Sequence, residues 1–169
     1  MFFQLASQMK KDLGQLVGWL DAASEHAKTR SFDPDLFLAV RLAPDQFPLL
    51  RQVQTACDTA KLSVSRLTGK PAPSHADDEK TMAELRARIA ATIEYLGGFT
   101  AADFEGAAGR SVTTARWEGK TMSGADYFIE HALPNFFFHL THTYAMLRHS
   151  GVALGKRDFL GTLSLRAPS

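Results

Sequence analysis

The segment from Leu133 to Gly161 carries the residues of this chain that are best suited to chemistry. His139, His142 and His149 follow one another there at spacings of three and seven. Because an α-helix advances about 100° per residue, a helix in this segment gathers on one face Asn135, His139, His142, Met146 and His149. Histidines on such a face act as metal ligands, as hydrogen-bonded core residues or as part of a contact surface.

The opposite face of the same helix is apolar. It contains Leu133, Phe137, Leu140, Tyr144 and Leu147, which we expect to fill a core. The two faces cannot both point into one bundle core. The histidine face therefore lines an internal polar pocket, or it faces solvent or a partner chain. One core cannot also hold all of the other large aromatic side chains, Phe136, Phe138 and Trp117. We therefore expect some of them to form a dimer face or to cover a pocket.

Four apolar stripes with helical spacing predict the long helices that position these residues. The first stripe begins at Phe2 and its helix is expected to reach about Lys28; the second runs from Phe47 to Leu67. Thr81 and Glu84 form a capping-box pattern before the third stripe, which ends near Leu96. The last helix is expected to follow a cap at Ser123 and to end near His149.

The segment from Arg110 to Thr121 favours extended structure, because β-branched residues precede Trp117. We expect a small hairpin or an irregular loop there. Pro134 lies within the last helical pattern, where proline predicts an interruption or a kink. The chain is interpreted as one all-α domain, residues 1–169, with this loop before the last helix.

Composition limits the function classes. The chain has 169 residues, a net charge of +1 and one cysteine, Cys57. The charge gives no case for nucleic acid as a partner, and no apolar run is long enough to predict a membrane partner. A single cysteine excludes an intramolecular disulfide and a cysteine-rich zinc site. We expect a cytoplasmic protein in which Cys57 is a buried structural thiol.

Three stretches resemble a known family. FFFHLTHTYAMLRHSGVALGKRDFLG is similar to the C-terminal signature of an uncharacterised branch of the DinB-like (YfiT-like) superfamily, and RLAPDQFPLLRQVQTACDTAKLSVSRLTG is similar to its second-helix signature. With DDEKTMAELRARI, the resemblance covers most of the chain. It implies an up-down-down-up four-helix bundle assembled as a homodimer. Better-known relatives bind a divalent metal through three histidines, and some are thiol-dependent transferases.

The resemblance also implies where a metal would bind. His139 matches the second ligand of the last helix, while Asn135 stands where the first ligand is expected. Asp58 is the residue nearest the ligand of the second helix. His142, one turn beyond His139, is a replacement for the missing ligand. The candidate metal residues are therefore Asp58, His139, His142 and Asn135, and the candidate metals are Zn, Ni and Mn.

Each candidate also has a structural interpretation. His139 would otherwise hydrogen-bond to Asp58 across the bundle, and that contact would raise the pKa of His139 unless burial outweighs it. Arg51 would either hold an anionic substrate or tie a loop by hydrogen bonds. His75, His131 and His149 lie near loops or helix ends and are expected to face water.

The sequence assigns no catalytic residue, no substrate and no small-molecule ligand. The first hypothesis is an uncharacterised DinB-like bundle protein with a degenerate metal site. The second is a divalent-metal-dependent hydrolase or thiol transferase that uses Asp58 and His139. The third is a non-catalytic dimeric binding or stress-response module, whose working part is its apolar helix surface.

Overall fold

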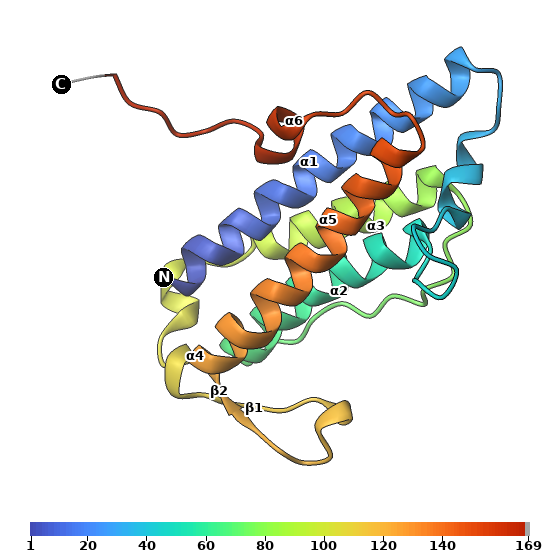
Figure 1. Ribbon diagram of the computed structural model, residues 1–169. Coiled ribbons are helices and arrows are strands. Elements are labelled where there is room, and N and C mark those ends of the chain that lie inside the picture. Colours follow the sequence, from blue (N-terminus) through green and yellow to red (C-terminus); the bar gives the residue numbers. More distant parts are fainter. Residues whose placement is uncertain (168–169) are drawn as a thin grey trace.

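A computed structural model describes residues 1–167 of the chain. Four long helices form an up-down-down-up bundle, as the sequence predicts (Figure 1). Their bounds are α1 (Phe2–Thr29), α2 (Leu49–Thr68), α3 (Met82–Gly97) and α5 (Leu133–His149). The shorter helical elements are η1 (Pro34–Ala39), η2 (Ala101–Phe104), η3 (Ala107–Gly109), η4 (Ala115–Trp117), α4 (Gly124–Asp126), η5 (Tyr127–Ala132) and α6 (Lys156–Leu160).

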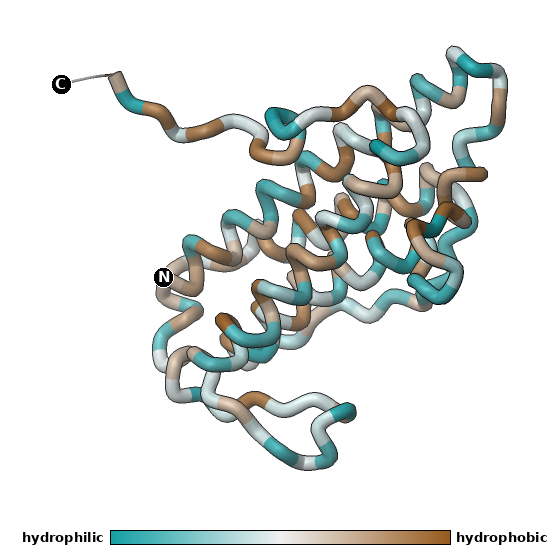
Figure 2. Tube along the Cα trace, viewed as in Figure 1, coloured by the Kyte–Doolittle hydropathy of each residue, from teal (hydrophilic) through white to brown (hydrophobic). Residues whose placement is uncertain are grey.

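Each long helix packs beside two others. The neighbouring pairs are α1 with α3, α3 with α2, α2 with α5 and α5 with α1. Hydrophobic and hydrophilic residues alternate along each helix in short runs (Figure 2), so that each helix buries one apolar stripe. Trp19, Phe128 and Phe136 are among the largest side chains of the resulting core.

The helix ends follow the expected local signals. Thr81 and Glu84 form the predicted capping box at the start of α3. Helix α2 begins directly after Pro48 and ends at Gly69, whose φ of 77° is the left-handed conformation that glycine adopts without strain. Phe47 lies before α2 and is 50 % exposed, so it does not belong to the buried stripe.

Helices α2 and α3 run in the same direction, which requires a long connection between them. Residues 69–81, here called the crossover segment, pass along the outside of the bundle from the end of α2 to the start of α3 (Figure 1). This segment contains no helix or strand of its own. Side-chain contacts therefore attach it to the bundle. Its ion pairs bear directly on the candidate site.

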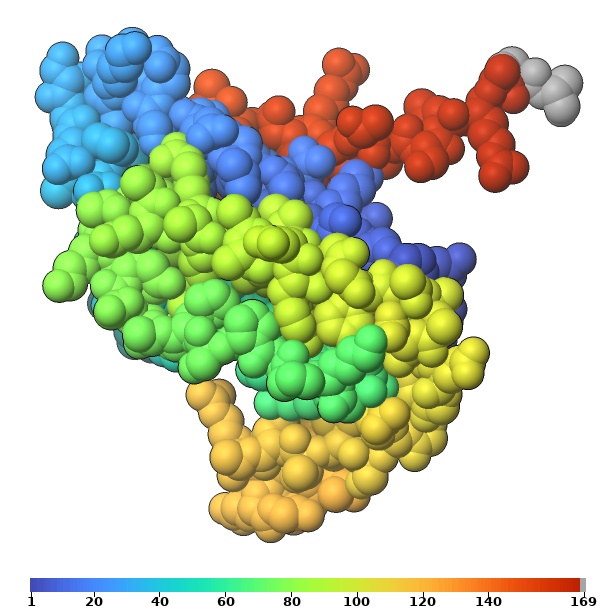
Figure 3. Space-filling view, turned by 180° about the vertical axis from the view of Figure 1, so that it is seen from behind, coloured from blue at the N-terminus to red at the C-terminus, as the bar shows by residue number. Residues whose placement is uncertain are grey.

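The predicted hairpin is present before the last helix. Strands β1 (Ser111–Val112) and β2 (Met122–Ser123) pair antiparallel, with Ser111 opposite Ser123. The loop between the strands contains η4, and Figure 3 shows the hairpin projecting from the body of the bundle. Ser123 caps α4 as expected, because its hydroxyl accepts a hydrogen bond from the Asp126 amide.

The interruption or kink expected at Pro134 takes the form of a π-helical turn directly before it. Element η5 widens the helix just before this proline, and the Leu133 amide donates to the Phe128 carbonyl five residues earlier. Proline has no N–H to give the carbonyl four residues before it, so the helix is open to rearrangement at this point. The wider turn carries Tyr127 and His131 onto the face that meets α2.

The buried face of α5 differs from the predicted one. Phe136, His139, Leu140, Thr143, Met146 and Leu147 are its buried residues. Phe137 and Tyr144 are only partly buried, while Phe138 is 52 % exposed. Helix α5 packs between α1 and α2, so the face toward α2 is as enclosed as the face toward α1. This is why His139 is buried.

After α5, the chain packs back against α1 through α6. The Trp19 indole donates to the Asp158 carbonyl and stacks on Phe159 at a centroid distance of 5.5 Å. Gly151, with a φ of 90°, provides the predicted left-handed residue after α5. Among residues 1–167, no helix combines the length and the apolar character needed to cross a bilayer.

Candidate functional site

A cavity of about 320 Å³ lies between α2, the η5–α5 helix and the hairpin loop. Helix α2 contributes residues spaced three and four apart, which places them on one helical face. These residues are Arg51, Thr55, Asp58, Leu62 and Arg66. The opposite wall comes from Tyr127, His131, Asn135 and His139, and the end of the cavity from Thr114, Ala115 and Arg116.

Three hydrogen bonds align the two helices along this cavity. His139 Nδ1 lies 2.7 Å from Gln52 Oε1 near the start of α2. In the middle, Asn135 Nδ2 donates to Thr59 Oγ1 over 2.7 Å. At the hairpin end, Arg66 Nη1 donates to the Tyr127 hydroxyl over 3.0 Å. The cavity therefore has a His139 end, a middle and a hairpin end.

Of the four predicted metal residues, three line the same cavity. Asp58, Asn135 and His139 are among its lining residues, but His142 is not. His142 instead points its Nδ1 at the Phe138 carbonyl, 2.6 Å away. His142 thus lies outside the cavity wall, and its role as a replacement ligand stays a prediction.

The expected contact between Asp58 and His139 is not formed. The nearest partner of the His139 ring is Gln52, whose amide nitrogen donates in turn to the Phe47 carbonyl. His139 is 6 % exposed, and burial, with the nearby charges of His142 and Arg51, lowers its pKa to about 4. The ring is therefore neutral at physiological pH, and burial outweighs any stabilisation of the charged form.

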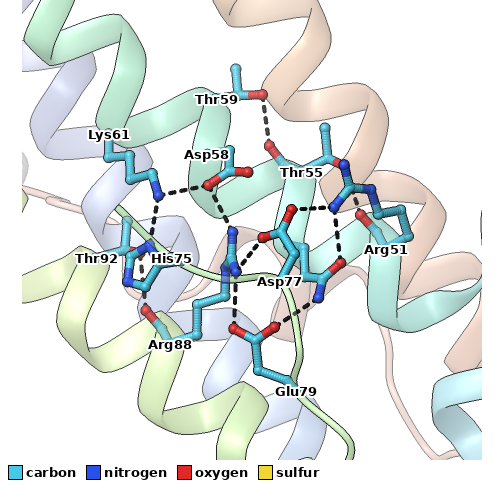
Figure 4. A network of polar contacts seen from close by, with 11 residues as sticks. Arg51, Thr55, Asp58, Thr59, Lys61, His75, Asp77, Glu79, Arg88 and Thr92 are labelled. Carbon is cyan, nitrogen blue, oxygen red and sulfur yellow. Dashed lines mark hydrogen bonds and ion pairs between the residues drawn. The ribbon is translucent and has the colours of Figure 1, made fainter. Parts of the chain in front are cut away.

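Asp58 pairs with cations behind the cavity wall, as Figure 4 shows. Its Oδ1 accepts a hydrogen bond from Arg88 Nη2 over 2.7 Å and forms an ion pair with Lys61 Nζ over 2.8 Å. Lys61 and Arg88 are both buried, with side chains only 5 % and 1 % exposed. This carboxylate is thus already neutralised by two buried cations.

Arg88 of α3 joins the crossover segment to helices α2 and α3. Its Nη1 donates to Asp77 over 2.6 Å and to Glu79 over 2.9 Å. Although burial opposes ionisation of both groups, hydrogen bonds from Arg51 and Arg88 hold the pKa of Asp77 below its usual range. Hydrogen bonds from Arg88 and Gln54 do the same for the pKa of Glu79. Asp77 and Glu79 therefore stay ionised beside one buried guanidinium.

Two further contacts complete this network (Figure 4). Arg51 Nη1 pairs with Asp77 over 2.5 Å, and Lys61 Nζ lies 2.6 Å from His75 Nδ1. Burial, followed by the charge of Lys61, lowers the pKa of His75, so the ring accepts the lysine hydrogen bond in its neutral form. His75 thus binds the bundle and does not simply face water. Arg51 has the loop-tying role that the sequence suggested, because it pairs with Asp77 of the crossover segment, and it also lines the cavity.

The hairpin end of the cavity carries positive charge without a matching acid. Within residues 1–167, neither Arg66 nor Arg116 forms an ion pair with a carboxylate. His131 lines the same end, with its Nδ1 buried and lacking a hydrogen-bond partner among the described residues. Burial, then Arg66 and Arg116, lowers the pKa of His131. The expectation that His131 faces water is therefore wrong.

The donors around His139 do not fit a three-histidine transition-metal centre. They comprise one imidazole, one amide and one carboxylate that already pairs with two cations, whereas such metals favour several imidazoles or thiolates. In the described part of the chain, no three His, Cys, Asp or Glu side chains gather in a metal-binding arrangement. Metal binding at Asp58, Asn135, His139 and His142 stays a prediction. Cys57 is buried, and burial raises the pKa of its thiol to about 12.

Sequence reasoning did not select Arg66, Arg116, His131 or Arg88. The spacing of polar residues along α2, from Arg51 to Arg66, was a usable signal for a polar helical face. Arg88 lies among the buried stripe residues Leu85 and Ile89, and a charge at a core position also indicates a buried ion-pair network. Nothing in the sequence indicated that the hairpin loop would reach the end of α2.

The comparisons with known proteins agree with this bundle. The model of the family described as "Domain of unknown function (DUF1993)" matches residues 1–160. A crystal structure of a DinB family member protein from Shewanella denitrificans, at 1.83 Å resolution, has 48 % sequence identity and a TM-score of 0.96; the match covers 99 % of this chain and 96 % of that chain. No curated protein matches the sequence.

Fold and sequence together thus define a DinB-like helical-bundle protein. The chain belongs to the DUF1993 family.

Proposed function

We propose that this protein binds a small anionic molecule in the cavity between α2, α5 and the hairpin, in place of the three-histidine metal centre that the resemblance implies. The observation that carries the proposal is the pair Arg66 and Arg116, which line one end of the cavity without a carboxylate partner among residues 1–167. A guanidinium recognises carboxylates and phosphates through charge-assisted hydrogen bonds.

The charges around the rest of the cavity support an anion there. Asp58, Asp77 and Glu79 are offset by Arg51, Lys61 and Arg88 through the ion pairs of the network. The two histidines of the cavity are held neutral by burial. The charge of Arg66 and Arg116 therefore remains for a ligand, in a concave site within the roughly 300–1,000 Å³ range of small-molecule pockets.

Calorimetric titration of the purified chain with inorganic phosphate and with small carboxylates tests this proposal. We expect binding that weakens with salt and that falls at least about tenfold in Arg66→Gln. Arg30→Gln is the matched control, because Arg30 is exposed and does not line the cavity. Equal loss in both variants, or no binding to the wild-type chain, would reject the proposal.

A divalent-metal-dependent hydrolase or thiol transferase is the competing function. It is favoured by one observation, the presence of Asp58, Asn135 and His139 in one cavity. Elemental analysis of the purified protein and of His139→Ala decides between the two. Stoichiometric metal that disappears in the variant would favour the metal-dependent enzyme and overturn the anion-binding proposal in its present form.

A further inference from the structure

The hydrogen-bonding groups along the cavity are not evenly distributed, and their distribution describes a ligand. This inference rests on the proposed function, because it assigns the anion of that proposal to one end of the cavity. The hairpin end offers donors: the guanidinium groups of Arg66 and Arg116, and the Tyr127 hydroxyl, whose oxygen already accepts from Arg66. An anion is the complement of such a set.

The middle of the cavity offers mainly acceptors. Both cationic partners of Asp58, Lys61 and Arg88, contact its Oδ1. No described residue hydrogen-bonds to its other oxygen, Oδ2. Asn135 uses its amide nitrogen to donate to Thr59, which leaves its carbonyl oxygen free. The hydroxyl protons of Thr55 and Thr59 are already given to backbone carbonyls one turn earlier.

His139 adds a further acceptor toward its end of the cavity. The amide nitrogen of Gln52 donates to the Phe47 carbonyl over 3.2 Å, so Gln52 presents its oxygen to His139 Nδ1. Nδ1 must then carry the proton of the neutral ring, and Nε2 keeps its lone pair. A ligand that fills the cavity must therefore donate hydrogen bonds to Asp58, Asn135 and His139.

The charge of the network decides which kind of donor the ligand carries. An ammonium group beside Asp58 would approach Lys61 and Arg88, both of which lie within 2.8 Å of the same carboxylate. Hydroxyl groups donate equally well and add no charge. The cavity thus favours hydroxyls over amines in its middle.

We infer that the ligand is a polyhydroxylated anion, such as a sugar phosphate or a sugar acid. Its acidic group lies against Arg66 and Arg116, and its hydroxyls donate to Asp58, Asn135 and His139. The 320 Å³ volume of the cavity suits a molecule of monosaccharide size. The shared chemistry is an acid joined to several hydroxyls, whichever acid the natural ligand carries.

Calorimetry with matched probes tests this inference on the wild-type chain. Propyl phosphate has the acid without donors, phosphoethanolamine adds an ammonium group, and glucose 6-phosphate and gluconate add hydroxyls to a phosphate or a carboxylate. We expect glucose 6-phosphate or gluconate to bind at least about tenfold tighter than propyl phosphate, which a few added hydrogen bonds would provide. Whichever of these two probes binds more tightly identifies the acidic group that the cavity prefers.

A variant separates the hydroxyl contacts from the anion contact. Asn135→Leu removes one of the three acceptors and should weaken glucose 6-phosphate more than propyl phosphate, whereas Arg66→Gln should weaken both. Circular dichroism checks that each variant is folded. The probe series on the wild-type chain tests the inference even if a variant does not fold.

Two outcomes overturn the inference in different ways. If all phosphates bind alike, or phosphoethanolamine binds tightest, the hydroxyl assignment fails while the anion-binding function stands. If no anion binds to the wild-type chain, the proposed function fails and the inference falls with it.

Discussion

Asp12 is a carboxylate buried in α1, outside the candidate site. It is 4 % exposed, its Oδ1 accepts a hydrogen bond from Gln8, and its Oδ2 is buried without a partner among the described residues. Burial raises its pKa from 3.8 to about 6, against the opposing effects of Gln8 and Lys11. Because the folded state holds this proton more tightly than the unfolded chain does, Asp12 destabilises the fold as pH rises through about 4 to 6.

We predict that Asp12→Asn gains stability relative to the wild type as pH rises. The shift from 3.8 to about 6 corresponds to a gain of at most about 3 kcal/mol between pH 4 and pH 7. Urea unfolding of both proteins at these pH values measures it. Asp45→Asn is the control, because Asp45 is exposed and has no ion pair within residues 1–167, and this variant should show a much smaller trend. A wild-type-minus-variant difference that stays constant with pH would contradict the prediction.

At this scale the sequence predicted some residues of the site better than their contacts. Helical periodicity placed Asn135 and His139 on one face, and the family resemblance placed Asp58 opposite them on the second helix. Their partners depend on the axial register and the rotamers of two packed helices, which the periodicity does not determine. The choice of Gln52 over Asp58 as the partner of His139 is such a case.

Among the elements, the hairpin depends on one glycine. A Cβ on Gly124 would lie 1.9 Å from the Ala107 carbonyl oxygen and 3.0 Å from Leu67 Cδ2. The start of α4 therefore packs directly against the backbone of η3, close to the end of α2. This contact fixes the hairpin loop that closes the cavity.

We predict that Gly124→Ala destabilises the protein, by about 1–3 kcal/mol or more for an overpacked core site, and weakens ligand binding by moving the loop of Arg116. Gly14→Ala is the matched control, since a Cβ at Gly14 in the middle of α1 meets no atom within 4 Å. It should be stabilising by roughly 0.5–1 kcal/mol through helix propensity. Thermal unfolding compares the two, and a Gly124 variant as stable as the wild type would contradict the predicted contact.

The long helices and their caps could be predicted because stripes, capping boxes and terminal glycines are local signals. The π turn of η5 could not. Pro134 marks a disturbed helix in either case, but whether the chain kinks or widens depends on how Tyr127, Phe128 and Ala132 pack in the core, where all three are buried. The position of the hairpin beside α2 is a tertiary contact of the same kind.

At the scale of the molecule, the homodimer implied by the family resemblance stays a prediction. Two large apolar side chains lie exposed on the η5–α5 helix, Ile129 at 54 % and Phe138 at 52 %. Exposed aromatic groups of this size are common in protein interfaces. They give the expected dimer a surface that a mutation can test.

We predict a mass in solution about twice the 18.6 kDa of the chain. Light scattering after size-exclusion chromatography measures it, and Phe138→Ser should shift the protein toward the monomer. Leu165→Ser, at a residue that is 84 % exposed near the end of the chain, should leave the mass unchanged. A monomer at every concentration would remove the dimer.

The π turn of η5 also determines how the residues that precede it in the helix are oriented around the helix axis relative to α5. A π turn holds one residue more than an α turn, so it acts as a one-residue insertion within a continuous helix. If the same residues were wound as a regular α-helix instead, the residues that precede the turn would be rotated by about 100° and shifted by about 1.5 Å relative to α5. Tyr127 would then turn away from Arg66, and the hairpin away from α2. The winding of this segment, and not only its composition, therefore determines whether a member of the family can keep the same ligand site.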